Sequence, residues 1–408
     1  MELFKKIITA CYDNGYTDLH IAGDHPLVCR RDGEVSFQKQ HVLSPQYVDQ
    51  LVEAILNPRQ KRQLKEHWST DLALSVADKR LRINVFSSHR GVSMAIRFLP
   101  SAIPDLQSLN LHPSLKDFCA MRSGLLLLCG STGSGKTTTI AALINEINSS
   151  RACHVVTLED PIEYLFTSRT AFIEQRELGK HFHSYQRGLL DVLRQAPDVI
   201  VVGEMRTPET IQLSLDAAES GHLVIATMHA GSHEEAVHRM CSLSQNGSSE
   251  HTRLQLSQSL AGIVNQQLLY MPRLRHSVPL LSVLRNTRAI STLIRENKLS
   301  QLDSTIETCK GQGMFTFDAY RQDYLATRTD FRKPLGLNVA SSTQAPQEYA
   351  SRVFDYDAQL GLRAEGAPNA AASGALNGAT GAPSVSGASG FGNEDVDDYI
   401  FELERRSA

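Results

Sequence analysis

The sequence predicts an α/β fold: a P-loop domain on a mostly parallel sheet, preceded by a small α+β domain. The first observation is a strand–loop–helix unit, in which the apolar run 125–129 leads into a glycine-rich loop and then a helical segment. The second is the alternation of apolar strands and helical segments between residues about 114 and 345, which is typical of a parallel sheet covered on both faces. The third is the series of short strands in the first hundred residues.

The loop Gly130–Thr137 fits the pattern G-x-x-x-x-G-K-[ST] at every fixed position. A glycine loop that opens a helix directs several backbone N–H groups at one phosphate chain. We expect Lys136 to reach the β- and γ-phosphates and the Thr137 hydroxyl to bind Mg²⁺. The flanking strand and helix argue against an accidental glycine-rich turn, so a nucleoside triphosphate with Mg²⁺ is the expected ligand. The predicted binding residues are Gly130, Ser131, Thr132, Gly133, Ser134, Gly135, Lys136, Thr137 and Thr138.

Acidic residues follow two further predicted strands. Strand 199–202 ends in Gly203 and Glu204, where a Walker B acid and second Mg²⁺ ligand belongs. Strand 154–158 leads into Glu159, Asp160 and Glu163, one of which could polarise an attacking water. A simple solvated turn is the alternative for this cluster.

Two histidines bracket the predicted strand 223–227. His229 follows the strand and is expected near the phosphates. His222 precedes it, at the opposite end, and is expected to be structural. The two therefore do not form one metal site.

The first hundred residues are expected to form a helix and strands around a small core. Ser44 is a plausible N-cap and Pro45 the first residue of a second helix. From residue 254 the pattern indicates helices to residue 323 and beyond, most prominently at 257–269. The other expected elements are a helix at 2–14, strands at 18–22, 71–76, 81–86 and 92–98, a hairpin at 27–37 and a helix at 45–56.

The expected domains are 1–100, a linker at 101–113, the P-loop domain at 114–345 and a tail at 346–408. Residues 366–393 carry no charge and are rich in Ala, Gly and Ser, which predicts a flexible linker. The acidic and aromatic residues 394–406 suggest a docking peptide at its end, and an ordinary solvated terminus is the alternative.

Composition limits the function classes. The formal net charge of −3 argues against a strongly basic nucleic-acid-binding protein. The seven cysteines lack C-x-x-C spacing, which suggests neither a zinc site nor a disulfide framework and favours a reducing compartment such as the cytosol. No apolar run is long enough to predict a transmembrane segment.

Several motifs in a fixed order resemble the secretion-type ATPases that drive type IV pili and type II secretion. They are TDLH at 17–20, the P-loop, TLEDPIEY at 157–164, LRQAPDVIVVGEMR at 193–206, GHLVIATMHA at 221–230 and GMFTFD at 313–318. The resemblance covers about residues 1–330 and is greatest to the PilT/PilU retraction branch, with LRQAPDVI and the long tail more similar to PilU-type members than to PilT.

The resemblance implies a RecA-like ATPase domain after a PAS-like N-terminal domain, in a homo-hexameric ring on the cytoplasmic face of the inner membrane. ATP is expected between the N-terminal domain of one subunit and the P-loop domain of the next, and a pilus platform protein is the expected membrane partner. Glu163 is implied as the catalytic carboxylate, Glu204 as the Walker B acid, and His229 as a neighbour of the γ-phosphate. The candidates for charge stabilisation at the phosphates are Arg82, Arg97, Arg194 and Arg206.

One departure from the family pattern concerns function. Retraction ATPases usually carry Ala-Ile-Arg where this chain has Ala289, Ile290 and Ser291. Two alternatives to a retraction motor therefore stay open. One is a secretion or pilus-assembly ATPase. The other is a low-turnover accessory subunit that acts beside a principal retraction ATPase, which the tail would recruit.

Overall fold

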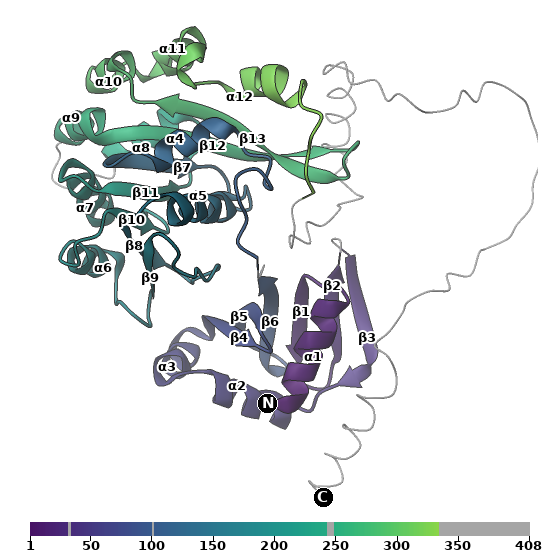
Figure 1. Cartoon of the computed structure of the whole chain (residues 1–408). Coiled ribbons are helices and arrows are strands. Elements are labelled where there is room, and N and C mark those ends of the chain that lie inside the picture. Colours follow the sequence, from purple (N-terminus) through teal and green to yellow (C-terminus); the bar gives the residue numbers. More distant parts are fainter. Residues whose placement is uncertain (32–33, 100–101, 243–248, 334–408) are drawn as a thin grey trace, which may run out of the picture.

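A computed structural model describes residues 1–31, 34–99, 102–242 and 249–333 (Figure 1). The predicted tail at 346–408, with its linker and docking peptide, lies outside the described residues, as does the predicted end of the P-loop domain at 345. The described chain forms an N-terminal antiparallel-sheet domain and a RecA-like P-loop domain.

The N-terminal domain is a six-stranded sheet in which all neighbouring strands are antiparallel, with three helices packed on it. Ser44 caps the second helix as predicted, because its side chain accepts a hydrogen bond from Tyr47 N. The elements are α1 (Glu2–Asp13), β1 (Asp18–Ala22), β2 (Pro26–Arg31), β3 (Glu34–Val42), α2 (Pro45–Ile55), α3 (Pro58–His67), β4 (Ser69–Val76), β5 (Lys79–Ser88) and β6 (Gly91–Leu99), in the sheet order β3-β2-β1-β6-β5-β4.

The P-loop domain is a seven-stranded sheet with the order β13-β12-β7-β11-β10-β8-β9. Only the edge strand β13 is antiparallel to its neighbour. Its strands are β7 (Gly124–Cys129), β8 (His154–Glu159), β9 (Phe172–Glu177), β10 (Val199–Val202), β11 (Leu223–Met228), β12 (Leu260–Met271) and β13 (His276–Arg285). The predicted strands at 125–129, 154–158, 199–202 and 223–227 are thus confirmed.

Helices cover both faces of this sheet, as predicted, and each face has its own buried apolar core. On one face lie α6 (Tyr185–Val192), α7 (Pro208–Glu219), α8 (His233–Ser242), α9 (Ser249–Ser259), α10 (Arg288–Arg295) and α11 (Leu302–Thr308). On the other lie α4 (Lys116–Cys119), α5 (Lys136–Ser150) and the turn of helix at Tyr320–Leu325, which follows α12 (Phe317–Ala319).

The prediction of a helix at 257–269 is wrong. Helix α9 ends at Ser259, and residues 260–271 form β12, which pairs with β7 and with β13. The first seven residues of β12 are buried on both faces of the sheet, so the sequence carries no period-2 alternation to distinguish it from a buried helix. The helical prediction for 254–323 therefore holds for the end of α9 and for the helices after residue 287, and it is wrong for the hairpin of β12 and β13.

Two elements gave little sequence signal. Helix α3 is almost entirely polar and is started by Asn57, which forms a capping box with Gln60. Strand β9 lies at the edge of its sheet and has only two apolar residues.

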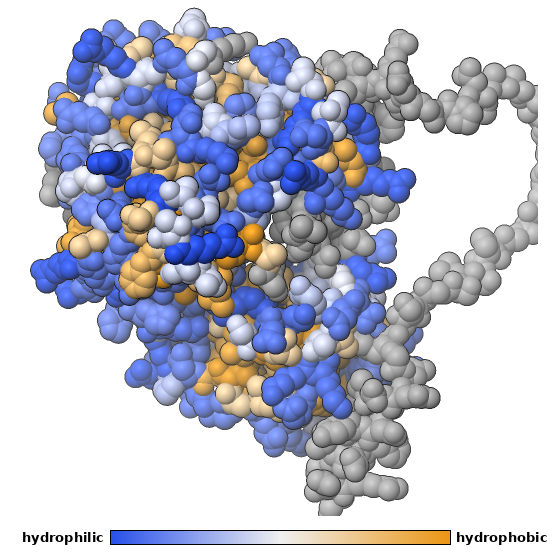
Figure 2. All heavy atoms as spheres, in the orientation of Figure 1, coloured by the Kyte–Doolittle hydropathy of each residue, from blue (hydrophilic) through white to orange (hydrophobic). Residues whose placement is uncertain are grey.

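Most of the molecular face seen in Figure 2 is hydrophilic, and apolar side chains reach it only in small patches. Within the described ranges, no helix is both long and apolar enough to cross a membrane.

Candidate nucleotide-binding site

The predicted site motifs meet at one edge of the P-loop sheet. Strands β7, β11, β10 and β8 are neighbours and parallel, so their carboxyl ends lie side by side. The P-loop follows β7, His229 follows β11, Glu204 follows β10 and the acidic turn follows β8. Gly203 N donates to Leu158 O over 2.8 Å, which fixes the segment before Glu204 against the strand that leads into the acidic turn.

The P-loop is shaped for an anionic ligand. Gly130, Gly133 and Gly135 all have positive φ angles, which an L side chain rarely adopts. Helix α5 begins at Lys136, whose buried ammonium donates to Gly130 O over 2.7 Å and to Ser131 O over 2.9 Å. Burial lowers the pKa of Lys136, and the charge of Glu204 opposes that shift.

The cradle leaves room and donors for phosphate. A Cβ on Gly133 would meet no atom within 4 Å, so the loop is open there. The buried Ser134 Oγ has no hydrogen-bond partner, and a Cβ at Gly130 would lie 2.7 Å from it. These residues fit a phosphate chain over the start of α5.

Gln266 supports the P-loop from the neighbouring strand β12. It was not among the predicted site residues, because 257–269 was expected to be a helix. Its side chain is buried on β12; Nε2 donates to Ser134 O over 2.7 Å, and Oε1 accepts from Thr139 Oγ1 over 2.7 Å. A Cβ on Gly130 would lie 2.3 Å from Gln266 O, so the neighbouring strand also requires glycine at this position.

Glu204 lies between Arg206 and His229. Arg206 Nη2 is 2.6 Å from one of its carboxylate oxygens, and His229 Nε2 is 3.2 Å from the other. Burial raises the pKa of Glu204, but the hydrogen bond and charge of Arg206, with smaller contributions from His229 and Lys136, bring it below its usual value. Glu204 is therefore held as a carboxylate next to the P-loop lysine.

The acidic turn contains carboxyl groups in different environments. Glu159 is enclosed: burial raises its pKa to about 7, although Thr157 Oγ1 and Gln175 Nε2 both donate to Oε1. Burial also raises the pKa of Glu163, against the charges of Arg82 and Arg97. Tyr164 Oη donates to Thr138 Oγ1 over 3.4 Å, which connects the turn to the P-loop helix.

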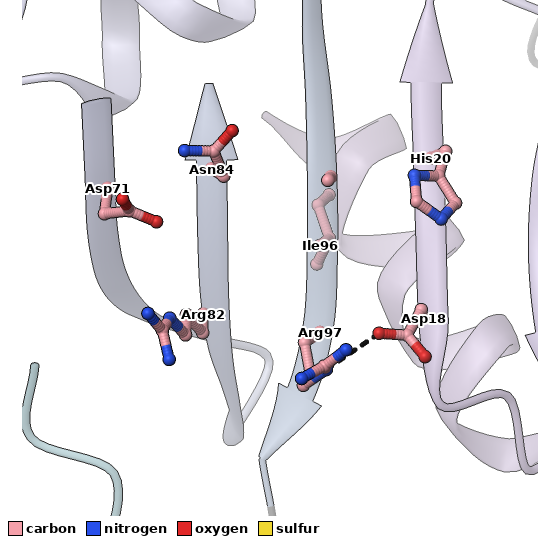
Figure 3. Close-up of a pocket in the computed structure, with 8 residues that line it drawn as sticks. Asp18, His20, Asp71, Arg82, Asn84, Ile96 and Arg97 are labelled. Atoms are coloured by element: carbon pink, nitrogen blue, oxygen red, sulfur yellow. Dashed lines mark hydrogen bonds and ion pairs between the residues drawn. The ribbon is translucent and has the colours of Figure 1, made fainter. Parts of the chain in front are cut away.

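Two of the four candidate arginines come from the N-terminal sheet of the same chain. Arg82 on β5 and Arg97 on β6 are cross-strand neighbours, and Arg97 Nε is 2.8 Å from Asp18 Oδ1 (Figure 3). They line a hollow of about 180 Å³ with Asp18, His20, Asp71, Asn84, Ala95 and Ile96. The N-terminal sheet adjoins the acidic turn of its own chain, because Arg80 on β5 donates to Ile162 O over 2.9 Å. The charges of Arg82 and Arg97 act on Glu163 in this turn.

The other two arginines differ from each other. Arg206 pairs with Glu204, as described above. Arg194 is exposed beyond the end of α6, and the structure gives its side chain no contact with the described site acids. His222 lies at the opposite end of β11 from the P-loop, where its ring Nδ1 donates to Ala217 O over 3.0 Å.

The comparison with known proteins decides the family. The sequence profile described as "Type II/IV secretion system protein" matches residues 1–313. This chain belongs to that family.

Two named relatives indicate the branch of the family to which this chain is similar. The chain is 35% identical over 305 residues to the type IV pilus retraction ATPase PilT of Pseudomonas aeruginosa, covering 74% of this chain and 88% of PilT. It is 33% identical over 316 residues to the type IV pilus ATPase PilU of the same organism, covering 77% of this chain and 83% of PilU. The fit to the PilT/PilU branch is confirmed, and these identities do not separate PilU-like from PilT-like.

A solved structure of the pilus retraction motor PilT with bound ADP superposes on this chain with a TM-score of 0.69. The two are 35% identical, and the match covers 77% of this chain and 94% of that one. This member of the secretion family is thus an ATPase with a RecA-like, nucleotide-binding domain.

Proposed function

We propose that this chain is the ATP-hydrolysing subunit of a ring motor that retracts type IV pili. The observation that carries the proposal is the meeting of the P-loop, Glu204, Glu163 and the N-terminal arginines at one site, in a chain similar to PilT and PilU over most of its length.

Each group has a role that its position supports. Thr137 and Glu204 would hold Mg²⁺, which neutralises charge on the phosphates when it is bound with ATP. Glu163 is the group that orients and polarises the attacking water, because its carboxyl is half-buried and is acted on by the charges of Arg82 and Arg97. Arg82 and Arg97 stabilise charge that develops on the phosphates.

The assembly is proposed by analogy with the relatives. Six copies form the ring, and a pilus platform protein in the inner membrane is the partner that it turns. A motor that consumes ATP and returns pilin to the bilayer works on the cytoplasmic face of that membrane. In such a ring a neighbouring subunit's N-terminal domain would complete the nucleotide site.

A second candidate is the accessory subunit, and Ser291 favours it. Ser291 Oγ donates to Ser257 O over 2.7 Å and so fixes α10 to the end of α9. The side chain makes a structural contact where a retraction motor usually carries a charged arginine. Hydrolysis by this chain would then support retraction only together with a principal ATPase.

The test is complementation of cells that lack their own retraction ATPases, with twitching motility and pilus retraction as the readouts. The wild-type chain should restore retraction, and Lys136→Ala should not. Restoration only in the presence of a second retraction ATPase would establish the accessory role. Secreted protein or assembled pili in place of retraction would establish the secretion or assembly alternative.

A further inference from the structure

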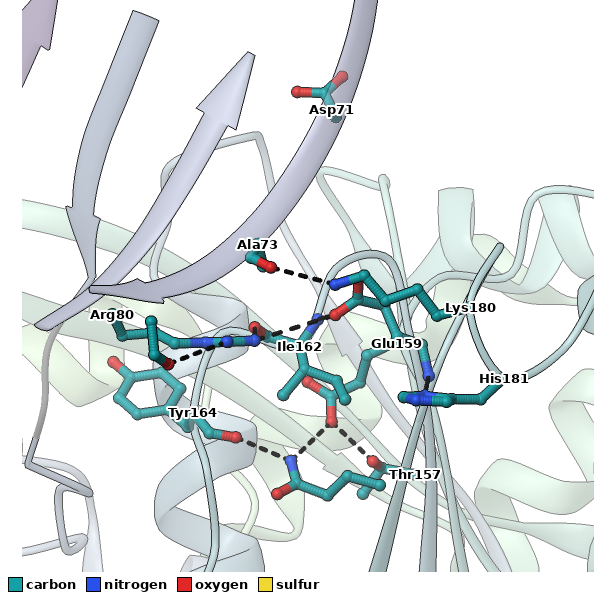
Figure 4. A network of polar contacts seen from close by, with 12 residues as sticks. Asp71, Ala73, Arg80, Thr157, Glu159, Ile162, Tyr164, Lys180 and His181 are labelled. Atoms are coloured by element: carbon teal, nitrogen blue, oxygen red, sulfur yellow. Dashed lines mark hydrogen bonds and ion pairs between the residues drawn. The ribbon is translucent and has the colours of Figure 1, made fainter. Parts of the chain in front are cut away.

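Glu177, at the end of strand β9, is the centre of a polar network between the two domains. Figure 4 shows this region around Arg80, Ile162 and Lys180. Its side chain is only 6% exposed. Lys180 Nζ lies 2.6 Å from Oε1, while Ile162 N donates to Oε2 over 3.3 Å and Arg80 Nη2 lies 3.9 Å from the same oxygen. A carboxylate so enclosed is stable only with such partners.

Two of these partners connect the network to the N-terminal sheet. Arg80 belongs to β5 and donates from Nη2 to Ile162 O over 2.9 Å. Lys180 follows β9 in the P-loop domain, and its Nζ donates to Ala73 O on β4 of the N-terminal sheet over 3.0 Å. The packing is close here, since a Cβ on Gly179 would lie 3.2 Å from Arg59 Nη1 of α3.

The network holds the backbone of Ile162 from both sides. Glu177 accepts from its N–H, and Arg80 donates to its carbonyl oxygen. That carbonyl belongs to the peptide unit that joins Ile162 to Glu163. The Arg80 contact therefore fixes the orientation of the backbone that carries the Glu163 side chain.

We infer that Arg80 and Glu177 are positioning residues for Glu163, and that they act only while the N-terminal sheet lies against the P-loop domain of the same chain. The inference rests on the catalytic role proposed for Glu163. When the N-terminal domain moves away, the bonds from Arg80 to Ile162 and from Lys180 to Ala73 break, and the backbone of Ile162 keeps only its contact with Glu177. Hydrolysis is in this way coupled to the position of the N-terminal domain.

The network allows variants that keep the fold. In Arg80→Ala, Glu177 remains paired with Lys180, so no uncompensated charge is left in the interface. Glu177→Gln keeps the shape of the side chain and an acceptor for Ile162 N. Arg90→Ala is the matched control, because Arg90 is exposed at the turn between β5 and β6, near the far end of the strand that carries Arg80.

The experiment compares the full-length protein with Arg80→Ala, Glu177→Gln, the double variant, Arg90→Ala and Glu163→Gln. The measurements are kcat and KM for ATP, the Kd for ADP, and hydrogen exchange of peptides that cover residues 158–166. We expect each single network variant to lower kcat about 10- to 100-fold. We expect the ADP Kd to stay within about twofold of the wild type, because Arg80 and Glu177 do not contact the P-loop.

The double variant should lose no more activity than the less active single variant, since both residues act through the backbone of Ile162. Exchange in 158–166 should rise in the network variants and stay unchanged in Arg90→Ala. Multiplied losses in the double variant, a parallel rise in the ADP Kd, or unchanged exchange would overturn the inference. If Glu163→Gln is inactive while Arg80→Ala is fully active, only the inference fails. If Glu163→Gln itself turns over ATP normally, the role proposed for Glu163 fails as well.

Discussion

Thr139 and Gln266 are joined by a buried hydrogen bond, in which Thr139 Oγ1 donates to Gln266 Oε1 over 2.7 Å. The two residues are far apart in sequence, one in the first turn of the P-loop helix and the other on the neighbouring strand β12. Because Gln266 Nε2 also donates to Ser134 O, a single side chain joins the loop to the helix that it opens. The P-loop is thus held in shape by hydrogen bonds from the neighbouring strand of the sheet.

Replacing Gln266 with Ala should loosen this cradle. Ser134 O and the Thr139 hydroxyl would lose their partners in a buried setting, at a cost of about 1–3 kcal/mol in the free energy of unfolding. We expect a lower midpoint in urea and an ADP affinity reduced about tenfold. Gln267→Ala is the control, because Gln267 is the next residue of β12 and is exposed. Equal stability and affinity in the two variants would contradict a supporting role for Gln266.

Glu163→Gln should reduce ATP turnover at least about 100-fold, the range usual for loss of a general base. The amide keeps the size of the side chain, and Lys136 and Thr137 are untouched, so ATP binding should persist. Steady-state turnover together with equilibrium ATP binding separates the two effects. If Glu163→Gln hydrolyses ATP at nearly the wild-type rate, a group other than Glu163 must activate the attacking water.

The pH dependence of turnover is an independent test of the role proposed for Glu163. Burial raises the pKa of Glu163, so kcat should begin to fall on acidification at a higher pH than an ordinary glutamate would give. The Arg82 charge opposes this shift, and Arg82→Ala should therefore move the acidic limb of the profile to still higher pH. If the acidic limb of the pH profile is the same in Arg82→Ala as in the wild type, the Arg82 charge does not act on Glu163.

The enclosed Glu159 predicts a pH dependence of stability. Its pKa of about 7 in the folded protein is above the ordinary value of 4.5, so the fold favours the protonated form. The stability that this preference contributes is fully present below pH about 4.5 and is lost as the pH rises through about 7. Between pH 5 and 8 the free energy of unfolding of the wild type should therefore fall by about 2–3 kcal/mol relative to Glu159→Gln. Urea unfolding at several pH values measures this, and parallel curves for the two proteins would rule it out.

The sequence predicted which motifs meet at the carboxyl edge of the parallel sheet, because each motif has a local signal. The P-loop, Glu204 and His229 each directly follow a short apolar strand, and a parallel sheet brings such strand ends together whatever their separation along the chain.

The residues that support the edge were not predictable in the same way. Gln266 lies on a strand buried on both faces, where apolar periodicity does not distinguish strand from helix. Glu177 ends a polar edge strand, and Arg80 is one of several basic residues on its hairpin. Their roles depend on contacts between distant segments, for which one sequence contains no local signal.

The most direct test of the account is steady-state ATP hydrolysis with Mg²⁺ by the purified wild type and by Glu204→Ala, together with the mass of each in solution. The account predicts substantial turnover by an assembly of about six wild-type subunits, and its loss in an equally assembled Glu204→Ala. A wild-type protein without turnover at high protein concentration, whether monomer or ring, would contradict a self-sufficient motor.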